Sequence, residues 1–120
     1  CVAHDCGRMI NPAGVPHQVH GNVIQSASRV LKEFVTFNKT GVTSLDWGGY
    51  PILRFDELPQ IDIQLIDRPE EAPMGAGESA SVPSAAAIGN ALFDALGVRL
   101  REVPFKPARV LAALRAQAGH

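Results

Sequence analysis

The sequence predicts an α+β fold, a small and mostly antiparallel sheet with two to three helices packed on it. Three segments repeat apolar residues at intervals of three or four, which is the period of one helix face. One segment alternates polar and apolar residues, as a half-buried strand does. The segments do not follow a regular strand–helix–strand order, which argues against a doubly wound parallel sheet. The length of 120 residues fits a single domain, residues 1–120.

The first half of the chain predicts a strand, a turn, a long helix and a hairpin. Residues 1–6 have the pattern of a strand, and the Asn-Pro and Gly residues of 7–14 are typical of a turn. Apolar positions with helical spacing then predict a helix over 15–32. Residues 33–37 and 42–47 are expected to pair as antiparallel strands, because the intervening NKTG favours a hairpin turn.

The second half predicts one strand and two helices joined by irregular segments. Residues 51–59 form a proline-bounded connector, with room for one helical turn. The alternation QIDIQLID over 60–67 predicts a half-buried strand, and the proline- and glycine-rich 68–77 predicts a loop. A helix over 83–97 would begin with a proline in its first turn and end at a glycine. A last amphipathic helix is predicted over 107–117.

Composition excludes several classes of partner. The hydrophobic content is 46% and the formal net charge is −1, so no basic surface for nucleic acid is expected. No apolar run approaches the roughly 20 residues of a membrane-spanning helix. The chain begins at Cys1 in what has the pattern of a strand already under way, with no initiator methionine. We therefore expect a piece of a longer polypeptide, and we make no prediction of its compartment.

The cysteines and histidines do not predict a metal site. Side chains alternate along a strand, so Cys1 and Cys6 would face opposite ways, and only Cys6 would share a face with His4. Two cysteines and one histidine are too few for a structural zinc site. We expect both cysteines to be free thiols that are buried or partly buried.

The segment GAGE at residues 75–78 is the first candidate for chemistry. Glycines ahead of a helix expose backbone N–H groups, which favour an anion there. GAGESA also fits a dinucleotide-binding pattern, but neither the preceding strand nor the acidic residue about 20 positions on is present. Glu78 has two interpretations: a carboxylate that merely caps the helix, or a carboxylate brought against a ligand by the backbone freedom of two glycines.

A stripe of polar side chains on the first predicted helix is the second candidate. Gln18, Asn22, Gln25 and Arg29 follow one another at spacings of four, three and four, so they share one side of the helix. A solvated helix face is the simple interpretation. Amides combine donors and acceptors, however, and this combination suits a heterocycle with several polar positions.

Three motifs together resemble a known family. They are "DCGR.INP", "Q..G..IQ" and "G.GE....P..AAI.NAL.DA.G.R.R..P", and the likeness runs from about residue 2 to residue 114. The chain resembles the C-terminal segment of the molybdopterin-binding large subunit of the xanthine dehydrogenase and aldehyde oxidase family. Within that family it is most like the isoquinoline 1-oxidoreductase beta subunit and the nicotinate dehydrogenase type.

The resemblance implies roles for particular residues. The family's catalytic base, a carboxylate beside molybdenum, matches Glu78, and a base is needed because the hydroxylating oxygen must lose a proton. Contacts with the molybdopterin cofactor are carried over to five positions: Gln18, Gln25, Gly75, Ala76 and Gly77. No residue of the chain is expected to ligate the metal itself. Ser79 and His20 depart from many relatives, which leaves the substrate open.

The resemblance also implies a function. We expect part of an oxidoreductase that hydroxylates an aldehyde or an N-heteroaromatic substrate with oxygen from water. Its partners would be the remainder of its own large subunit and a 2Fe-2S small subunit, and the isolated chain would bind no cofactor and be inactive. The alternative is a non-enzymatic α+β packing or oligomerisation module whose glycine loop only caps a helix.

Overall fold

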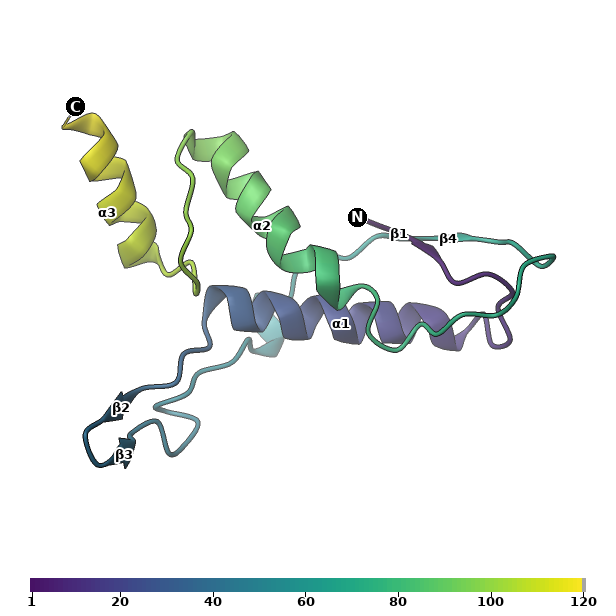
Figure 1. Cartoon of the computed structure of the whole chain (residues 1–120), viewed down its shortest axis with the longest axis horizontal. Coiled ribbons are helices and arrows are strands. Elements are labelled where there is room, and N and C mark those ends of the chain that lie inside the picture. The colour runs from purple at the N-terminus through teal and green to yellow at the C-terminus, as the bar shows by residue number, and fades with distance from the viewer. Residues whose placement is uncertain (120) are drawn as a thin grey trace.

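The computed structural model describes residues 1–119, and over these residues the chain has an α+β fold (Figure 1). This confirms the predicted fold class. Three α-helices, two pairs of strands and one short 3-10 helix follow in chain order: β1 (Val2–Asp5), α1 (Gly14–Leu31), β2 (Phe37–Asn38), β3 (Gly41–Val42), η1 (Phe55–Glu57), β4 (Ile63–Ile66), α2 (Ser81–Leu96) and α3 (Pro107–Ala118).

Helix α1 is the central element of the structure. It runs along the long axis of the molecule, and both α2 and β4 contact it (Figure 1). The predicted apolar stripe is its buried face: Val15, Ala27 and Val30 are buried, and Val19 is completely so. A helix with one apolar side gains most of its stability from such packing rather than from intrinsic propensity.

The longer strand pair brings together the N-terminus of the chain and a segment near its middle. Strand β1 pairs with β4 in parallel, with Val2 opposite Ile63 and Asp5 opposite Ile66. The strands are thus divided between one parallel and one antiparallel pair, where the sequence predicted mostly antiparallel pairing. Parallel pairing places the C-terminal ends of β1 and β4 at the same edge. The chain therefore leaves this edge twice, once as the turn at 6–13 and once as the loop that follows β4.

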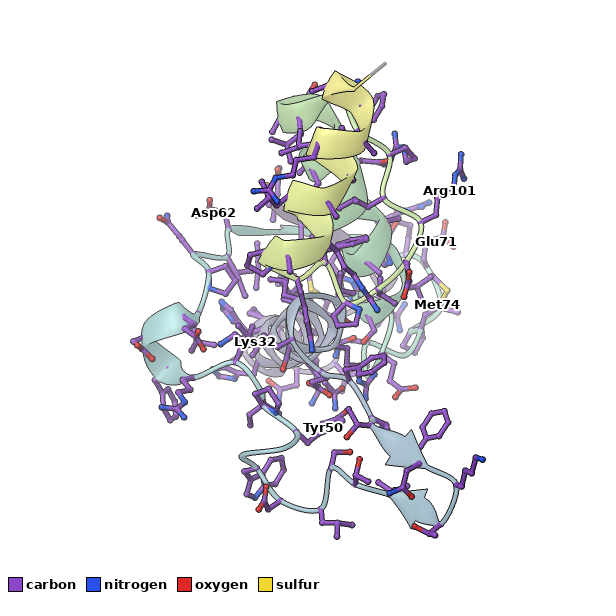
Figure 2. All side chains as sticks on the ribbon, turned by 90° about the vertical axis from the view of Figure 1, so that its left-hand side faces the viewer. Lys32, Tyr50, Asp62, Glu71, Met74 and Arg101 are labelled. Atoms are coloured by element: carbon purple, nitrogen blue, oxygen red, sulfur yellow. The ribbon has the colours of Figure 1, made fainter. Side chains whose placement is uncertain are left out.

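The predicted hairpin is present but much shorter than expected. Strands β2 and β3 pair over two residues each around the predicted turn, instead of over 33–37 and 42–47. Phe37 is 77% exposed, so the hairpin has no buried face on which a longer pairing would gain stability. Figure 2 looks nearly along α1 and shows the hairpin projecting away from the helices. The Tyr50 hydroxyl, after the hairpin, donates to Glu33 Oε2 at 2.7 Å, just beyond the end of α1.

The ends of the last two helices agree with the local sequence signals. Helix α2 closes at Gly97, whose φ of +67° is the left-handed conformation that glycine adopts without strain. Helix α3 begins at Pro107, which occupies its first turn. Between these helices the chain returns to α1, where the Phe105 N–H donates to the Val30 carbonyl at 2.7 Å.

The cysteine prediction is correct for one residue and wrong for the other. Both thiols are free; Cys6, directly after β1, is buried as His4 is, but Cys1 is exposed. Within residues 1–119, no cluster of three potential ligands is arranged to hold a metal ion. Over the same residues, no helix combines the length and the apolar character needed to cross a membrane.

The chain leaves much apolar surface uncovered. Its radius of gyration is 17.8 Å, against about 14 Å for a compact domain of this length. Its accessible surface is 8492 Å², roughly 2,200 Å² more than a folded monomer of this mass exposes. Phe55, Leu45 and Trp47 are 95%, 82% and 74% exposed. Large apolar side chains exposed in this way are typical of a surface that packs against further protein.

Candidate functional site

The loop between β4 and α2, which carries Gly75, Ala76, Gly77 and Glu78, crosses α1 (Figure 1). We call residues 72–80 the Glu78 loop. It has little regular structure, and its ends are attached to two different parts of the first half of the chain. Its conformation is therefore fixed by tertiary contacts rather than by helix or sheet pairing.

The first attachment is at the edge where β1 ends. The Met74 N–H donates to the Cys6 carbonyl at 2.8 Å. Gly7 has a φ of +66°, and a Cβ at this position would overlap the Ala72 carbonyl oxygen. Glycine is thus required at residue 7 both by its own backbone conformation and by the close passage of the loop.

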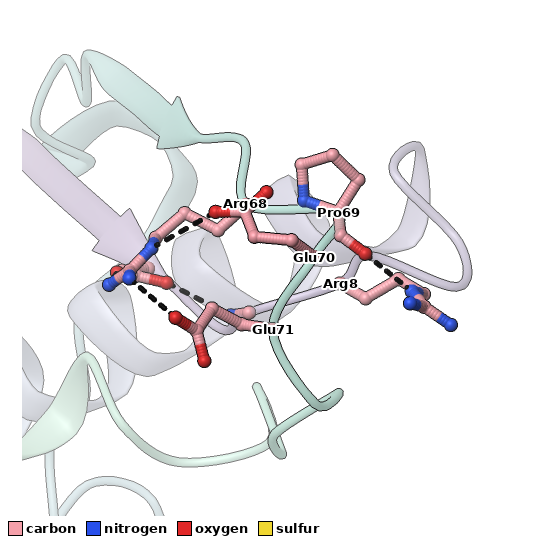
Figure 3. Close-up of polar contacts among 7 residues, drawn as sticks. Arg8, Arg68, Pro69, Glu70 and Glu71 are labelled. Carbon is pink, nitrogen blue, oxygen red and sulfur yellow. Dashed lines mark hydrogen bonds and ion pairs between the residues drawn. The ribbon is translucent and has the colours of Figure 1, made fainter.

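A polar cluster reinforces this first attachment (Figure 3). Arg8 Nε donates to the Pro69 carbonyl at 2.7 Å. The Arg68 guanidinium pairs with Glu71 at 2.7 Å and with Asp5 at 3.4 Å. Each exposed pair contributes at most about 1 kcal/mol, so the cluster acts mainly by fixing where the loop begins.

The Asp5 carboxylate also closes the turn after β1. The backbone N–H of Gly7 donates to Asp5 Oδ1 at 2.9 Å. This bond, together with the nearby Arg68 guanidinium, lowers the pKa of the Asp5 carboxyl below its ordinary value, because both favour the charged form.

The second attachment is a single buried side chain of α1, Asn22. Its Nδ2 donates to the Gly77 carbonyl and to the Gln18 carbonyl, at 2.7 Å each. Its Oδ1 accepts from the Ser81 N–H at 3.2 Å and from the Ser81 hydroxyl at 3.1 Å. Gly77, directly before Glu78, and Ser81, three residues after it, are consequently held by the same amide group.

The two glycines of the loop are not explained by the packing of this chain. Apart from the adjoining residues, no atom of the described chain lies within 4 Å of a Cβ built on Gly75 or Gly77. Unlike Gly7, neither has a positive φ. Space is therefore open beside both, so that a group from outside the chain has access to the backbone at contact distance.

Glu78 itself is exposed and does not cap α2. The N-cap residue of α2 is Ala80, with no side-chain cap and no acidic residue in the first helical turn. Within residues 1–119, the Glu78 side chain forms no ion pair. The Glu78 side chain therefore makes no capping hydrogen bond to α2.

Gln18 and Ala76 lie together, whereas Gln25 lies apart. Gln18, Ala76 and Met74 line one surface cavity of about 280 Å³ beside the loop. Gln25 lines a different cavity, of about 340 Å³, with Tyr50. Gln18 and Gln25 are seven positions apart, which corresponds to about 10 Å along the axis of α1. The structure thus brings Gln18 to the Glu78 loop and sets Gln25 at a second position on the same helix.

The predicted amide stripe is divided by burial. Gln18, Gln25 and Arg29 are exposed, whereas Asn22 is 7% exposed and attaches the loop. The helical spacing groups Asn22 with the other three residues and does not reveal this separate role. The available signal was its spacing of three from Val19, which places it beside the apolar stripe, where a buried amide needs partners.

Comparisons with known proteins identify the family of the chain. The sequence profile of the molybdopterin cofactor-binding domain matches residues 1–59, which include Gln18 and Gln25. One of the subunits of the nicotinate dehydrogenase of Pseudomonas putida is 64% identical over 113 residues, or 94% of this chain. The chain belongs to the xanthine dehydrogenase and aldehyde oxidase family. The resemblance seen in the sequence motifs is confirmed.

Other members of the xanthine dehydrogenase and aldehyde oxidase family match nearly the whole chain as well. The beta subunit of isoquinoline 1-oxidoreductase from Brevundimonas diminuta is 33% identical over 106 residues, or 88% of this chain. The crystal structure of quinoline 2-oxidoreductase from Pseudomonas putida 86 superposes with a TM-score of 0.81 at 28% identity, over 94% of this chain. The chain spans 10%, 13% and 15% of the lengths of these three relatives.

Proposed function

We propose that this chain supplies the catalytic base, Glu78, to the molybdenum centre of a larger hydroxylase subunit. The reaction is the hydroxylation of an aldehyde or an N-heteroaromatic substrate with oxygen from water. When bound, molybdopterin supplies the metal centre that oxidises the substrate. The chain's own residues hold this cofactor and move the proton.

The observation that carries the proposal is an exposed, unpaired carboxylate on a loop fixed at both ends. Glu78 forms no ion pair among residues 1–119, and Asn22 holds the backbone around it. A carboxylate whose backbone is already positioned loses little freedom when a substrate binds, and this lowers the barrier for proton transfer. The carboxylate accepts the proton at about 2.6–3.2 Å or through one water.

The residues around Glu78 fit a bulky polar cofactor. The open space beside Gly75 and Gly77 admits a group to contact distance with the backbone. Gln18 and Ala76 line the adjoining cavity, where the Gln18 amide offers two donors and an acceptor to a pterin. Gln25 would contact a part of the cofactor that lies further along α1.

The names of the relatives guide the choice of substrate. The 64% identical relative is part of a nicotinate dehydrogenase, and two others are named for isoquinoline and quinoline. An aldehyde oxidoreductase of Megalodesulfovibrio gigas is 32% identical. N-heteroaromatic compounds are therefore the first substrates to test, followed by aldehydes.

The proposal includes two protein partners, the remainder of the large subunit and a 2Fe-2S small subunit that receives the electrons. The exposed apolar side chains of the hairpin and connector, such as Trp47 and Phe55, suit burial against the former. By itself the chain is proposed to bind no cofactor and to be inactive. Stoichiometric binding of molybdopterin by the isolated chain would contradict this part.

The test is Glu78→Gln in the intact subunit, with turnover and molybdenum content measured on the same preparation. Glutamine keeps the size of the side chain but cannot act as a base, so turnover is expected to fall by about 10²–10⁴-fold while molybdenum content is unchanged. Glu102→Gln, the same replacement at a side chain that is 76% exposed and pairs with Arg109 away from the Glu78 loop, is the matched control and should retain turnover. Full turnover in Glu78→Gln would refute the proposal.

A further inference from the structure

We propose that Asn22 is the positioning residue of the Glu78 loop and sets the place of the catalytic carboxylate from helix α1. The inference rests on the proposed function of Glu78. It adds a residue whose effect on turnover is exerted through Glu78 and not through direct contact with substrate or cofactor.

The hydrogen bonds of Asn22 bracket Glu78. The carbonyl that receives the Asn22 Nδ2 donor belongs to Gly77, so this bond orients the peptide unit that joins Gly77 to Glu78. After Glu78, Asn22 Oδ1 accepts a hydrogen bond from the Ser81 N–H. The same N–H also donates to the Glu78 carbonyl at 3.0 Å. The peptide groups before and after Glu78 are thereby both held, directly or through Ser81, by the Asn22 side chain of α1.

The orientation of the Asn22 amide is itself determined by its surroundings. The side chain is 7% exposed, and both donors and both acceptor positions are occupied, by Gln18, Gly77 and Ser81. A flipped amide would direct its oxygen at two carbonyl oxygens, so one orientation satisfies the network. A fully satisfied buried amide is rigid, and Asn22 is therefore a firm support for the loop.

No other side chain shares this task. Within residues 1–119, Asn22 is the only side chain that hydrogen-bonds to residues 75–79. The first attachment ends at Met74, and the Ser26 hydroxyl reaches only the Ser81 carbonyl, at 3.4 Å. The Ser84 hydroxyl donates to the Ala80 carbonyl at 2.6 Å, one residue beyond this stretch. Among the described residues, loss of Asn22 would therefore leave the backbone of residues 75–79 without a side-chain hydrogen bond.

Asn22→Asp is the sharpest variant because it separates the two halves of the amide. Aspartate has nearly the same size and can still accept from Ser81, but an ionised carboxylate has no proton to donate to Gly77 or Gln18. The Gly77 carbonyl then faces an acceptor, and the peptide before Glu78 is released. Asn38→Asp is the matched control, since Asn38 also pins a turn, in the hairpin, but uses only its acceptor oxygen.

The experiment measures four quantities in the intact subunit: kcat, KM, molybdenum content, and amide hydrogen exchange of the 77–81 segment in cofactor-free protein. For Asn22→Asp, kcat is expected to fall about 10²-fold, as a displacement of about 1 Å can cause. KM and molybdenum content should stay within about twofold, which is small on this scale, and exchange at 77–81 should accelerate. Asn38→Asp should leave all four quantities unchanged.

A double-mutant cycle separates positioning from a general structural role. If Asn22 acts through Glu78, Asn22→Asp should lower turnover little further when Glu78→Gln is already present. Additive losses, or a kcat for Asn22→Asp equal to that of the unchanged subunit, would overturn the inference. If Glu78→Gln alone retains turnover, the proposed function fails instead, so the two failures are distinguishable.

Ser81→Ala keeps the inference testable if Asn22→Asp does not accumulate. It removes the hydroxyl that donates to Asn22 Oδ1 but leaves the Ser81 N–H in place. Loss of one such hydrogen bond is expected to lower kcat by about 2- to 10-fold and to accelerate exchange at 77–81. Unchanged kcat and exchange in Ser81→Ala would overturn the inference.

Discussion

Replacing Gly77 by alanine tests whether glycine is required at this position by the packing of this chain or by contact with the proposed cofactor. The change adds one methyl group to the loop next to Glu78. Apart from the adjoining residues, nothing in the described chain lies within 4 Å of that methyl, and the φ of Gly77 is not positive. Within this chain, the alanine side chain would therefore cause neither a steric clash nor backbone strain.

Gly77→Ala is expected to affect the stability of the cofactor-free subunit and the retention of the cofactor in opposite directions. Alanine restricts the unfolded chain, so the cofactor-free subunit should be unchanged or stabilised by up to about 1 kcal/mol. If the cofactor contacts the backbone at Gly77, the methyl overpacks that contact at a cost of about 1–3 kcal/mol. Such a cost corresponds to about 5- to 150-fold weaker retention.

The assay for Gly77→Ala combines the urea midpoint of the cofactor-free subunit with the molybdenum content and turnover of the purified enzyme. Gly89→Ala is the matched control, since its methyl would make only an ordinary contact with Phe105, at 3.5 Å. We expect Gly89→Ala to keep molybdenum and turnover. A Gly77→Ala enzyme with full molybdenum content and full turnover would refute the argument that the open side of this glycine receives the cofactor.

Two further predictions concern the first attachment of the loop. Gly7→Ala should lower the free energy of unfolding by at least about 1–2 kcal/mol, since alanine is strained at φ +66° and would also overlap the Ala72 carbonyl oxygen; an unchanged urea midpoint would contradict this. The lowered pKa of Asp5 means that its stabilising contribution is present above the ordinary value of 3.8 and is lost as the pH falls below it. Pepsin digestion of the 68–74 segment should therefore accelerate with acidification more in the unchanged subunit than in Asp5→Asn. Equal pH profiles for the two proteins would exclude the role of Asp5.

Features set by neighbouring residues could be predicted from the sequence. Gly97 and Pro107 mark the end of α2 and the start of α3 because their backbone preferences act locally. The alternating burial of 61–66 follows the alternation of side chains along the strand. The partner of this strand could not be deduced in the same way, because β1 and β4 are separated by about half the chain and pair through tertiary structure.

The hairpin was overpredicted for a physical reason. Residues 33–37 and 42–47 have the composition of strands, but Phe37 and Val42 are exposed in this chain. Apolar residues stabilise a strand only when one face is buried, and here no part of the described chain covers them.

The candidate site was predicted in part. The sequence motifs indicated Glu78 and its glycines, and the structure adds that space is open beside Gly75 and Gly77. Asn22 was recognised only as one polar residue of a stripe, because its burial depends on where residues 77–81 cross α1. That crossing is set by contacts between segments more than 50 residues apart, which local periodicity does not reveal.

The most direct test of the central claim is an experimental structure of the intact subunit with its cofactor bound. The account predicts that the Glu78 carboxylate faces the bound cofactor at hydrogen-bond distance, about 2.6–3.2 Å, directly or through one water. A Glu78 carboxylate that faces bulk solvent, with the metal centre beyond the reach of a bridging water, would contradict it.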